Sequence, residues 1–319
     1  KTLSLYLEDN RNALSSWLHQ YWDSNRKEGA WQDVFGTAAP EIFSAYTIAT
    51  YINFIAEQGK RKYALPLLAN AWTVQCENEP AGKFPSGGPV ARVHDIWRHA
   101  APSIDILAPD LYLENFKDEC QEYTRLADNP LFIPEMRRDK WAMAHVFYAV
   151  GEHRAICVSP FGIDSLIQTQ HAVLDDANVQ EVVKTLNTSF SLSLSAAYSV
   201  LENLLPLLHD SDLAAQGILQ DHLPYHYLAL NNTAMQIVFN STLYDATEPA
   251  GGLVVEVGEG ELILAGAGFT AVLHTEIIEI EEGKYHNGQW MCYRRLNGDE
   301  RNLRMPEVPS IRRVRYLVR

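Results

Sequence analysis

Glu135 is the residue whose type and position point most directly to chemistry. It follows the apolar run of residues 131–134, which predicts a buried strand. A carboxylate fixed at the end of a buried strand can attack an anomeric carbon or shuttle a proton. The same position also suits a glutamate at the N-terminus of the helix that we expect next, where the helix dipole favours a negative charge. The residue alone leaves both interpretations open.

Other polar and aromatic residues share this placement just after a short apolar run. They are, in chain order, Asn70, Trp72, Asp110, Tyr112 and Phe161. The aromatic rings among them suit sugars, which stack on flat apolar surfaces. The alternative is that Asp110 caps the next helix and that the aromatic residues are ordinary members of a core edge.

The elements that must position these residues alternate along residues 1–210. The predicted strands are residues 64–72, 103–108, 131–133 and 154–158, and the predicted helices are residues 40–58, 90–99, 114–126, 138–150, 176–186 and 195–209. Strands separated by helices pair in parallel through right-handed βαβ crossovers. The carboxyl ends of parallel strands form the functional edge of such folds, so we expect the residues above to meet at one edge.

The pattern changes after His209, and residues 210–212 mark an expected domain boundary. From residue 253 onward short β-rich runs dominate, residues 216–240 are expected to supply the first strands, and hairpins are predicted at residues 258–260 and at Asn287-Gly288. The sequence therefore predicts an α/β domain over residues 1–210 and an antiparallel β-sandwich domain over residues 211–319. The arginine-rich C-terminal segment indicates a solvated edge strand, with a binding patch as the alternative.

Composition and missing motifs exclude several classes of protein. The chain of 319 residues has a formal net charge of −14, which opposes binding to nucleic acid and to anionic membranes, because both need a basic surface. It contains no apolar run of about 18 residues that would span a bilayer. The four cysteines lie far apart, and no P-loop, dinucleotide or zinc motif occurs, so we expect neither a metal site nor a cofactor.

Three motifs follow one another in the middle of the chain: IDILAPDLY at residues 104–112, NPLFIPE at residues 129–135 and SPFGI at residues 159–163. Together with residues 31–36, 65–72, 250–253 and 294–299 they resemble glycoside hydrolase family 35, in its β-galactosidase-like branch. The resemblance implies the C-terminal half of a (β/α)8 TIM barrel followed by a β-sandwich, and a retaining mechanism. It assigns the nucleophile to Glu135 and its orientation to Tyr112. The substrate-binding residues expected around them are Asn70, Trp72, Asp110, Tyr112 and Phe161.

The resemblance also implies that part of the catalytic machinery lies outside this sequence. The family's acid/base glutamate belongs to a segment expected before Trp31 that is absent here. We therefore expect the N-terminal half of the same barrel as a partner, either as a preceding segment or as a separate chain. The expected function is exo-acting hydrolysis of terminal β-galactosides without a cofactor. The alternative is a non-catalytic carbohydrate-binding or structural protein that retains the barrel edge.

The compartment and the assembly state are left open. Asn-x-Ser/Thr sequons occur at Asn187, Asn231 and Asn240, and they favour secretion and an extracellular location. The sequence is compatible with a homo-oligomer and with a monomer. Neither alternative changes the residues that we expect in the site.

Overall fold

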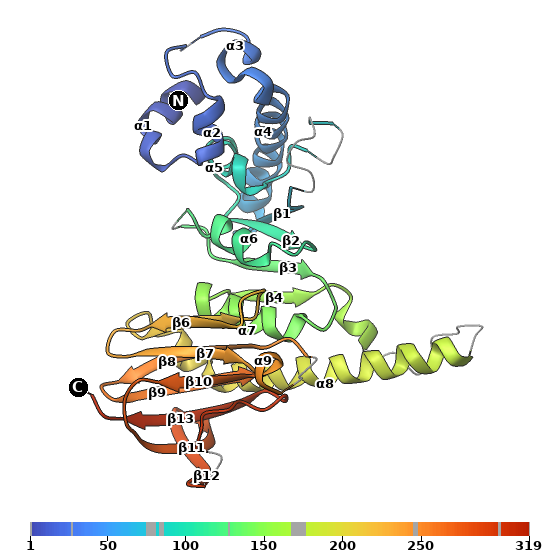
Figure 1. Cartoon of the computed structure of the whole chain (residues 1–319). Coiled ribbons are helices and arrows are strands. Elements are labelled where there is room, and N and C mark those ends of the chain that lie inside the picture. Colours follow the sequence, from blue (N-terminus) through green and yellow to red (C-terminus); the bar gives the residue numbers. More distant parts are fainter. Residues whose placement is uncertain are drawn as a thin grey trace. The chain divides into compact units, whose positions relative to one another are not determined.

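The chain divides into two compact units, Lys1–Met136 and Arg137–Arg319, which we describe in turn (Figure 1). The structure, a computed structural model, describes residues 2–26, 28–74, 81–82, 86–126, 128–166, 177–244, 248–298 and 301–318. Of residues 165–166 and 177–190 it describes the backbone alone. The predicted domains, residues 1–210 and 211–319, stay a prediction, and the division into compact units falls at a different position.

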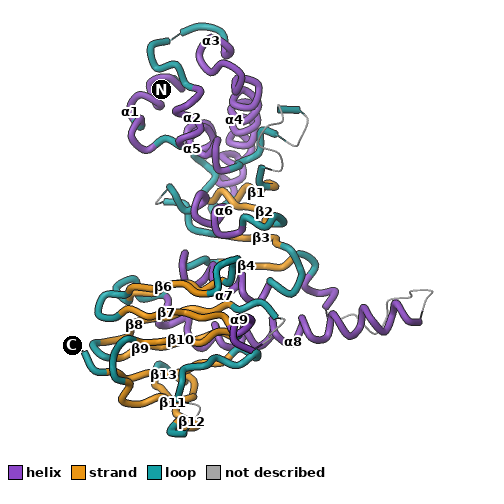
Figure 2. Tube along the Cα trace, viewed as in Figure 1, coloured by secondary structure: helices purple, strands orange, loops and turns teal. Residues whose placement is uncertain are grey.

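The first unit combines helices with short parallel strands (Figure 2). Its helices are α1 (Leu3–Asp9), α2 (Ser16–Tyr21), α3 (Trp31–Phe35), α4 (Ala39–Lys62), α5 (His94–Ala100) and α6 (Phe116–Tyr123). Its strands are β1 (Leu68–Trp72), β2 (Ile106–Leu111) and β3 (Phe132–Met136). The alternation of strands and helices predicted from the sequence is confirmed for this part of the chain.

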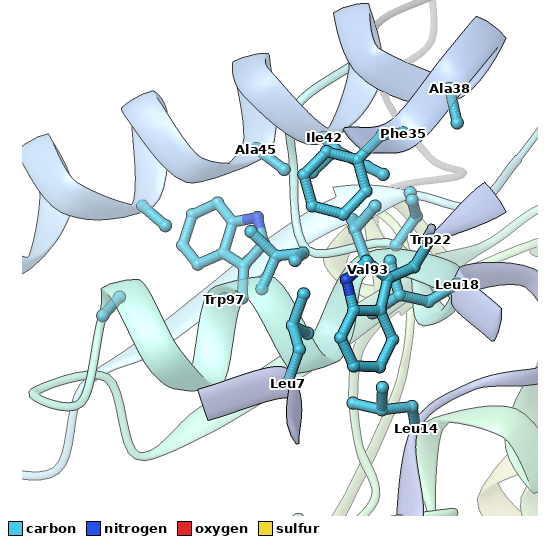
Figure 3. Close-up of a cluster of buried hydrophobic side chains, with 14 of the residues drawn as sticks. Leu7, Leu14, Leu18, Trp22, Phe35, Ala38, Ile42, Ala45, Val93 and Trp97 are labelled. Atoms are coloured by element: carbon cyan, nitrogen blue, oxygen red, sulfur yellow. The ribbon is translucent and has the colours of Figure 1, made fainter. Parts of the chain in front are cut away.

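The helices of the first unit enclose an apolar core, shown in Figure 3. Leu7 of α1, Leu18 of α2 and Ile42 of α4 are fully buried there, and Trp97 of α5 is almost so. The indole N–H of Trp97 donates a hydrogen bond to the carbonyl of Gly87 at 3.2 Å, so the ring is buried without an unpaired donor. This core holds the helices of the first unit together and includes Leu107 of β2.

Helix α4 also carries an apolar stripe that the rest of the unit leaves exposed. Its first four members lie three to five residues apart, the fifth directly follows the fourth, and all are between 40% and 64% exposed: Phe43, Ile48, Tyr51, Phe54 and Ile55. Residues at this spacing share one face of a helix. Among the described residues no helix is both long and apolar enough to cross a membrane.

Strands β1, β2 and β3 lie side by side in this order and run parallel. The register places Trp72 opposite Asp110 and Asp110 opposite Glu135. Strand β1 begins at Leu68 and not at residue 64, because Pro66 has no N–H to give to a ladder. Strand β2 begins at Ile106 and not at residue 103, and it extends through Leu111. Parallel pairing, the central expectation for this region, is confirmed.

The second unit is mainly antiparallel sheet. Its helices are α7 (Ala142–His153), α8 (Ala177–Leu208) and α9 (Asn240–Tyr244). Its strands are β4 (Cys157–Pro160), β5 (Ala214–Leu219), β6 (Tyr225–Ala229), β7 (Ala234–Phe239), β8 (Gly251–Gly258), β9 (Glu261–Ala267), β10 (Phe269–Leu273), β11 (Ile277–His286), β12 (Gln289–Leu296) and β13 (Ser310–Tyr316). The two helices expected at residues 176–186 and 195–209 are one continuous helix, so that expectation was wrong.

Two antiparallel sheets form the C-terminal part of this unit. One has the order β12-β11-β13-β9-β8-β5 and the other the order β10-β7-β6. A core that includes Val254, Leu264, Phe269 and Ile237 is built from strands of both sheets, as in a β-sandwich. Both predicted hairpins are present, joining β8 to β9 and β11 to β12. The coarse expectation of an α/β chain that ends in antiparallel sheets is therefore confirmed.

The arginine-rich strand β13 lies inside its sheet, between β11 and β9, so its interpretation as an edge strand was wrong. Its arginines stand opposite glutamates of the neighbouring strands. Arg313 donates two hydrogen bonds to the carboxylate of Glu261, at 2.9 and 2.7 Å, and Arg315 pairs with Glu279. These cross-strand pairs satisfy the charges without a solvated edge.

Helix α7 packs directly onto strands β5 and β8 through glycines. A Cβ atom at Gly251 of β8 would lie 2.3 Å from the Cα of Ala144, and one at Gly151 of α7 would lie 2.6 Å from the Cβ of Leu253. These distances are too short for real atoms, so only glycine allows the helix to approach the sheet this closely. Helix α7 is thereby part of the same packed body as the antiparallel sheets.

Candidate functional site

The carboxyl ends of β1, β2 and β3 bring most of the predicted site residues together in the first unit. Trp72 is the last residue of β1, and Asp110 and Glu135 are the next-to-last residues of β2 and β3. Since these three residues are register partners, their side chains leave the same face of the sheet in one row. Tyr112 follows β2 directly, and Asn70 lies two residues before Trp72 on the same face of β1.

The carboxylate of Glu135 is held by Tyr112. The tyrosine hydroxyl donates a hydrogen bond to Oε2 of Glu135 at 2.7 Å, and both side chains are half-buried. A hydroxyl donor at this distance fixes the orientation of the carboxylate. Burial, followed by the hydrogen bond to Glu135, raises the pKa of Tyr112 well above its ordinary value, so the phenol stays protonated and remains a donor.

Asp110 lies between Asn70 and Glu135. The amide Nδ2 of Asn70 donates to both carboxylate oxygens of Asp110, at 2.8 and 3.1 Å. The pKa of Asp110 is raised to about 6, because burial and the interactions with Glu135 raise it and the Asn70 hydrogen bond lowers it by less. The side chain is only 4% exposed. Asp110 is thus almost fully buried at this edge of the sheet, and its role as a substrate-binding residue stays a prediction.

Trp72 supplies the open aromatic surface of this edge. It is 53% exposed, and its ring centroid lies 6.1 Å from that of Tyr112 at an interplanar angle of 53°. An indole face with this exposure offers the flat apolar area on which a pyranose ring can stack. Phe161 belongs to the second unit, where it follows β4 and is 61% exposed, and its role as a substrate-binding residue stays a prediction.

The interpretation of Glu135 as a helix-terminal residue is excluded by its secondary structure. Glu135 lies within β3, and the next helix, α7, begins at Ala142, with Trp141 preceding it. The helix was expected to begin at residue 138. Because Glu135 is fixed in a sheet and not at a helix start, the dipole argument no longer accounts for its presence.

The pairing of Asp110 with Glu135 in the strand register is the feature that the sequence analysis missed. A signal was present, because each of the two residues directly follows a proline, Pro109 in β2 and Pro134 in β3. Proline is rare inside strands because it cannot donate to the ladder. A proline followed by an acid in each of two consecutive strands therefore indicates that the two acids occupy the same position in their strands. Equivalent positions on adjacent parallel strands are register partners.

The described residues offer acid and aromatic chemistry and no arrangement suited to a metal. Within that part of the chain, no group of three or more His, Cys, Asp or Glu side chains is placed to hold an ion. Cys76 lies outside the described residues. The arrangement that remains is a hydrogen-bonded carboxylate, a buried acid next to it and an exposed indole.

Comparison with known proteins adds one match, which lies in the second unit. Residues 194–306 match a family described as Domain of unknown function (DUF5597). The matched residues run from the C-terminal part of α8 through β12 and so cover most of the antiparallel sheets. No curated protein matches this chain.

Proposed function

We propose that this chain carries the nucleophile side of a retaining glycoside hydrolase, exo-acting on terminal β-galactosides, with Glu135 as the nucleophile. The observation that carries the proposal is the 2.7 Å hydrogen bond from Tyr112 to Glu135 at the carboxyl end of a parallel strand. A nucleophilic carboxylate must be fixed in orientation, and the tyrosine donor supplies this property. The exposed indole of Trp72 provides a platform for the sugar ring.

The reaction proceeds in two displacements. An oxygen of Glu135 forms a bond to the anomeric carbon while the bond to the leaving oxygen breaks, and water then attacks the glycosyl-enzyme and releases the carboxylate. The first step needs an acid to protonate the leaving oxygen, and the second needs the same group as a base. Asp110 does not fill that role, because it is buried behind Glu135 and bonded to Asn70.

The resemblance to glycoside hydrolase family 35 implies that the acid/base group comes from the N-terminal half of the barrel, as a preceding segment or a separate chain, and the proposal includes this half. In this proposal β1, β2 and β3 with their helices are part of a (β/α)8 barrel that such a segment completes. A barrel of this kind places its active site at the carboxyl ends of the strands, where Glu135 and Trp72 lie.

Covalent trapping tests the proposal without depending on the acid/base group. A 2-deoxy-2-fluoro-β-galactoside with a dinitrophenyl leaving group needs no proton donor, and its fluorine slows hydrolysis of the glycosyl-enzyme. We expect intact-mass analysis to show one added fluorosugar and peptide mapping to place it on Glu135. The Glu135→Gln variant, which retains the size of the side chain, should remain unlabelled. Labelling at another residue, or none in any form of the protein that contains both halves, contradicts the proposal.

A non-catalytic carbohydrate-binding protein is the second candidate, and the exposure of Trp72 favours it. Stacking on an indole needs no nucleophile, so binding would survive Glu135→Gln and disappear in Trp72→Ala. Calorimetric titration with galactosides, run beside the labelling experiment, separates the two. Binding that depends on Trp72 without labelling of Glu135 supports this candidate.

A further inference from the structure

Asp110 is a buried acid whose surroundings come from three neighbouring elements. Asn70 of β1 donates to it, and Glu135 of β3 is its partner in the strand register. Among the described residues, its charge also raises the pKa of Tyr112 and that of Tyr123 in α6. Burial raises the pKa of both tyrosines, so both stay neutral, and Asp110 has no cation among these neighbours to compensate a negative charge.

Asp110 and Glu135 are register partners on neighbouring parallel strands, and two carboxyl groups this close cannot both be ionised at low cost, so the pair shares a proton. The structure indicates which member keeps it. Asp110 is 4% exposed, and burial disfavours its charged form, whereas Glu135 is half-buried and accepts a hydrogen bond from the hydroxyl of Tyr112. The proton is therefore more stable on Asp110.

We propose that Asp110 is a positioning residue that, as a neutral carboxylic acid, donates a hydrogen bond to Glu135 and holds that carboxylate in place. Glu135 is then fixed from two sides, by the Tyr112 hydroxyl and by the Asp110 acid. Asn70 fixes the Asp110 carboxyl itself. The role as a positioning residue rests on the function proposed above, because it presumes that Glu135 attacks a sugar. The shared proton does not rest on it.

The arrangement has a consequence for pH. Ionisation of Asp110 replaces the hydrogen bond with repulsion between two carboxylates, which displaces Glu135 from its place. The pKa of Asp110 is raised to about 6. Above this pH the population with the proton in place decreases about tenfold for each pH unit, and the reactivity of Glu135 decreases with it.

Carbon-13 NMR of the full chain, labelled at the aspartate side-chain carboxyls, tests the shared proton without any substrate. We expect a titration midpoint for Asp110 near pH 6, assigned by its absence in Asp110→Asn. Glu135→Gln should lower this midpoint by about one pH unit or more, because the neighbouring charge is gone. Asn70→Ala should raise the Asp110 midpoint, because the donor to the ionised form is gone.

Asp105 is the internal reference in this experiment. Lys60 and the backbone amide of Leu67 hold the pKa of Asp105 below its ordinary value. An Asp110 midpoint near pH 4, or no change in Glu135→Gln, overturns the inference.

The labelling rate tests the positioning role. In the wild-type protein the rate of labelling by the fluorogalactoside should decrease above pH 6. Asp110→Asn keeps a donor to Glu135 and an acceptor for Asn70 but cannot ionise, so its rate should not decrease over this range. Asp105→Asn is the matched control and should retain the wild-type pH profile.

A wild-type profile in Asp110→Asn contradicts the positioning role and leaves the glycosidase proposal intact. Absence of labelling in all variants, with the NMR midpoints as expected, contradicts the glycosidase proposal and leaves the shared proton established.

Discussion

The carboxylate of Glu135 accepts a hydrogen bond from Tyr112 and contributes little to the apolar core. Glu135→Gln removes the proposed nucleophile and keeps the volume of the side chain, so kcat for a nitrophenyl β-galactoside should decrease at least about a thousandfold, or about 4 kcal/mol of activation free energy. The thermal midpoint of unfolding should change little. A variant that retains most of its kcat in the protein with both halves present would show that Glu135 is not the nucleophile.

Tyr112→Phe removes the donor and retains the ring that lies beside Trp72. Loss of a hydrogen bond to a charged group costs about 1.5–3 kcal/mol, so kcat should decrease by about ten- to a hundredfold, with a smaller change in KM. Tyr51→Phe is the matched control, because Tyr51 is 64% exposed on α4. Equal effects of the two substitutions would argue against a role for the Tyr112 hydroxyl.

Asn240 shows that one of the three sequons is inaccessible. Its side chain is 1% exposed, Nδ2 donates to the carbonyl of Met305 at 3.0 Å, and Oδ1 accepts from the hydroxyl of Thr270 at 3.1 Å. An N-linked glycan would replace one amide proton and require space that the core does not have. Asn231 is exposed, and the side chain of Asn187 lies outside the described residues.

Expression in a secreting host should therefore give a glycan on Asn231 and none on Asn240 of the folded protein, as read by peptide mass mapping. Asn240→Ala should lower the free energy of unfolding by about 1–3 kcal/mol, because the Met305 carbonyl and the Thr270 hydroxyl lose their buried partner. A glycan found on Asn240 in soluble, folded protein would contradict this placement.

At the scale of elements, the contact between α7 and β8 depends on Gly251. Gly251→Ala should lower the free energy of unfolding by about 1–3 kcal/mol or more, because the added methyl group meets backbone atoms of Ala144 that cannot move independently. Gly258, at the other end of the same strand, has no atom within 4 Å of the equivalent position. Gly258→Ala should change stability by no more than about 0.5 kcal/mol. Chemical denaturation of the two variants measures the difference, and equal effects would contradict the close approach.

The existence and type of most elements could be predicted from the sequence, because their apolar periodicity is strong. The boundaries could not, since they depend on contacts between distant residues. Residues 64–67 continue the apolar run of β1, but Leu65 donates to the carbonyl of Tyr63 in a turn, and Pro66 has no donor. The sequence analysis expected two helices, at residues 176–186 and 195–209, in the place of helix α8. The residues between them include Ser189, Ser191 and Ser193, and serine is a weak helix former, but the helix continues through them.

The sequence allowed us to predict which residues lie at the candidate site, but it did not allow us to predict which of them pair with one another. Position after a strand identified Glu135, Asp110 and Trp72, since parallel strands end at a common edge. The distinct roles of Asp110 and Glu135 arise from register, which pairs them, and from depth, which buries Asp110 alone. Register and depth are properties of the assembled sheet, and a single sequence does not display them.

At the scale of the whole molecule, the second unit includes α7 and α8 as well as the antiparallel sheets. A fragment of residues 137–319 should therefore unfold in one cooperative transition. In the full chain, Gly217 of β5 and Gly251 of β8 lie close against α7. A fragment of residues 211–319 lacks α7, so these faces of β5 and β8 become exposed. We expect this shorter fragment to bind hydrophobic dyes and to lack a cooperative transition. Cooperative unfolding of the shorter fragment with the same midpoint would show instead that the sheets fold without α7.

The apolar stripe on α4 governs how copies of the chain behave together in solution. The net charge of −14 keeps copies apart at low ionic strength, where repulsion extends over tens of ångströms. Salt shortens that range to a few ångströms, and the exposed rings of Tyr51 and Phe54 can then come into contact. The chain is thus colloidally stabilised by its charge, and added salt should raise the average mass measured by static light scattering, whereas Phe54→Glu should reduce that increase.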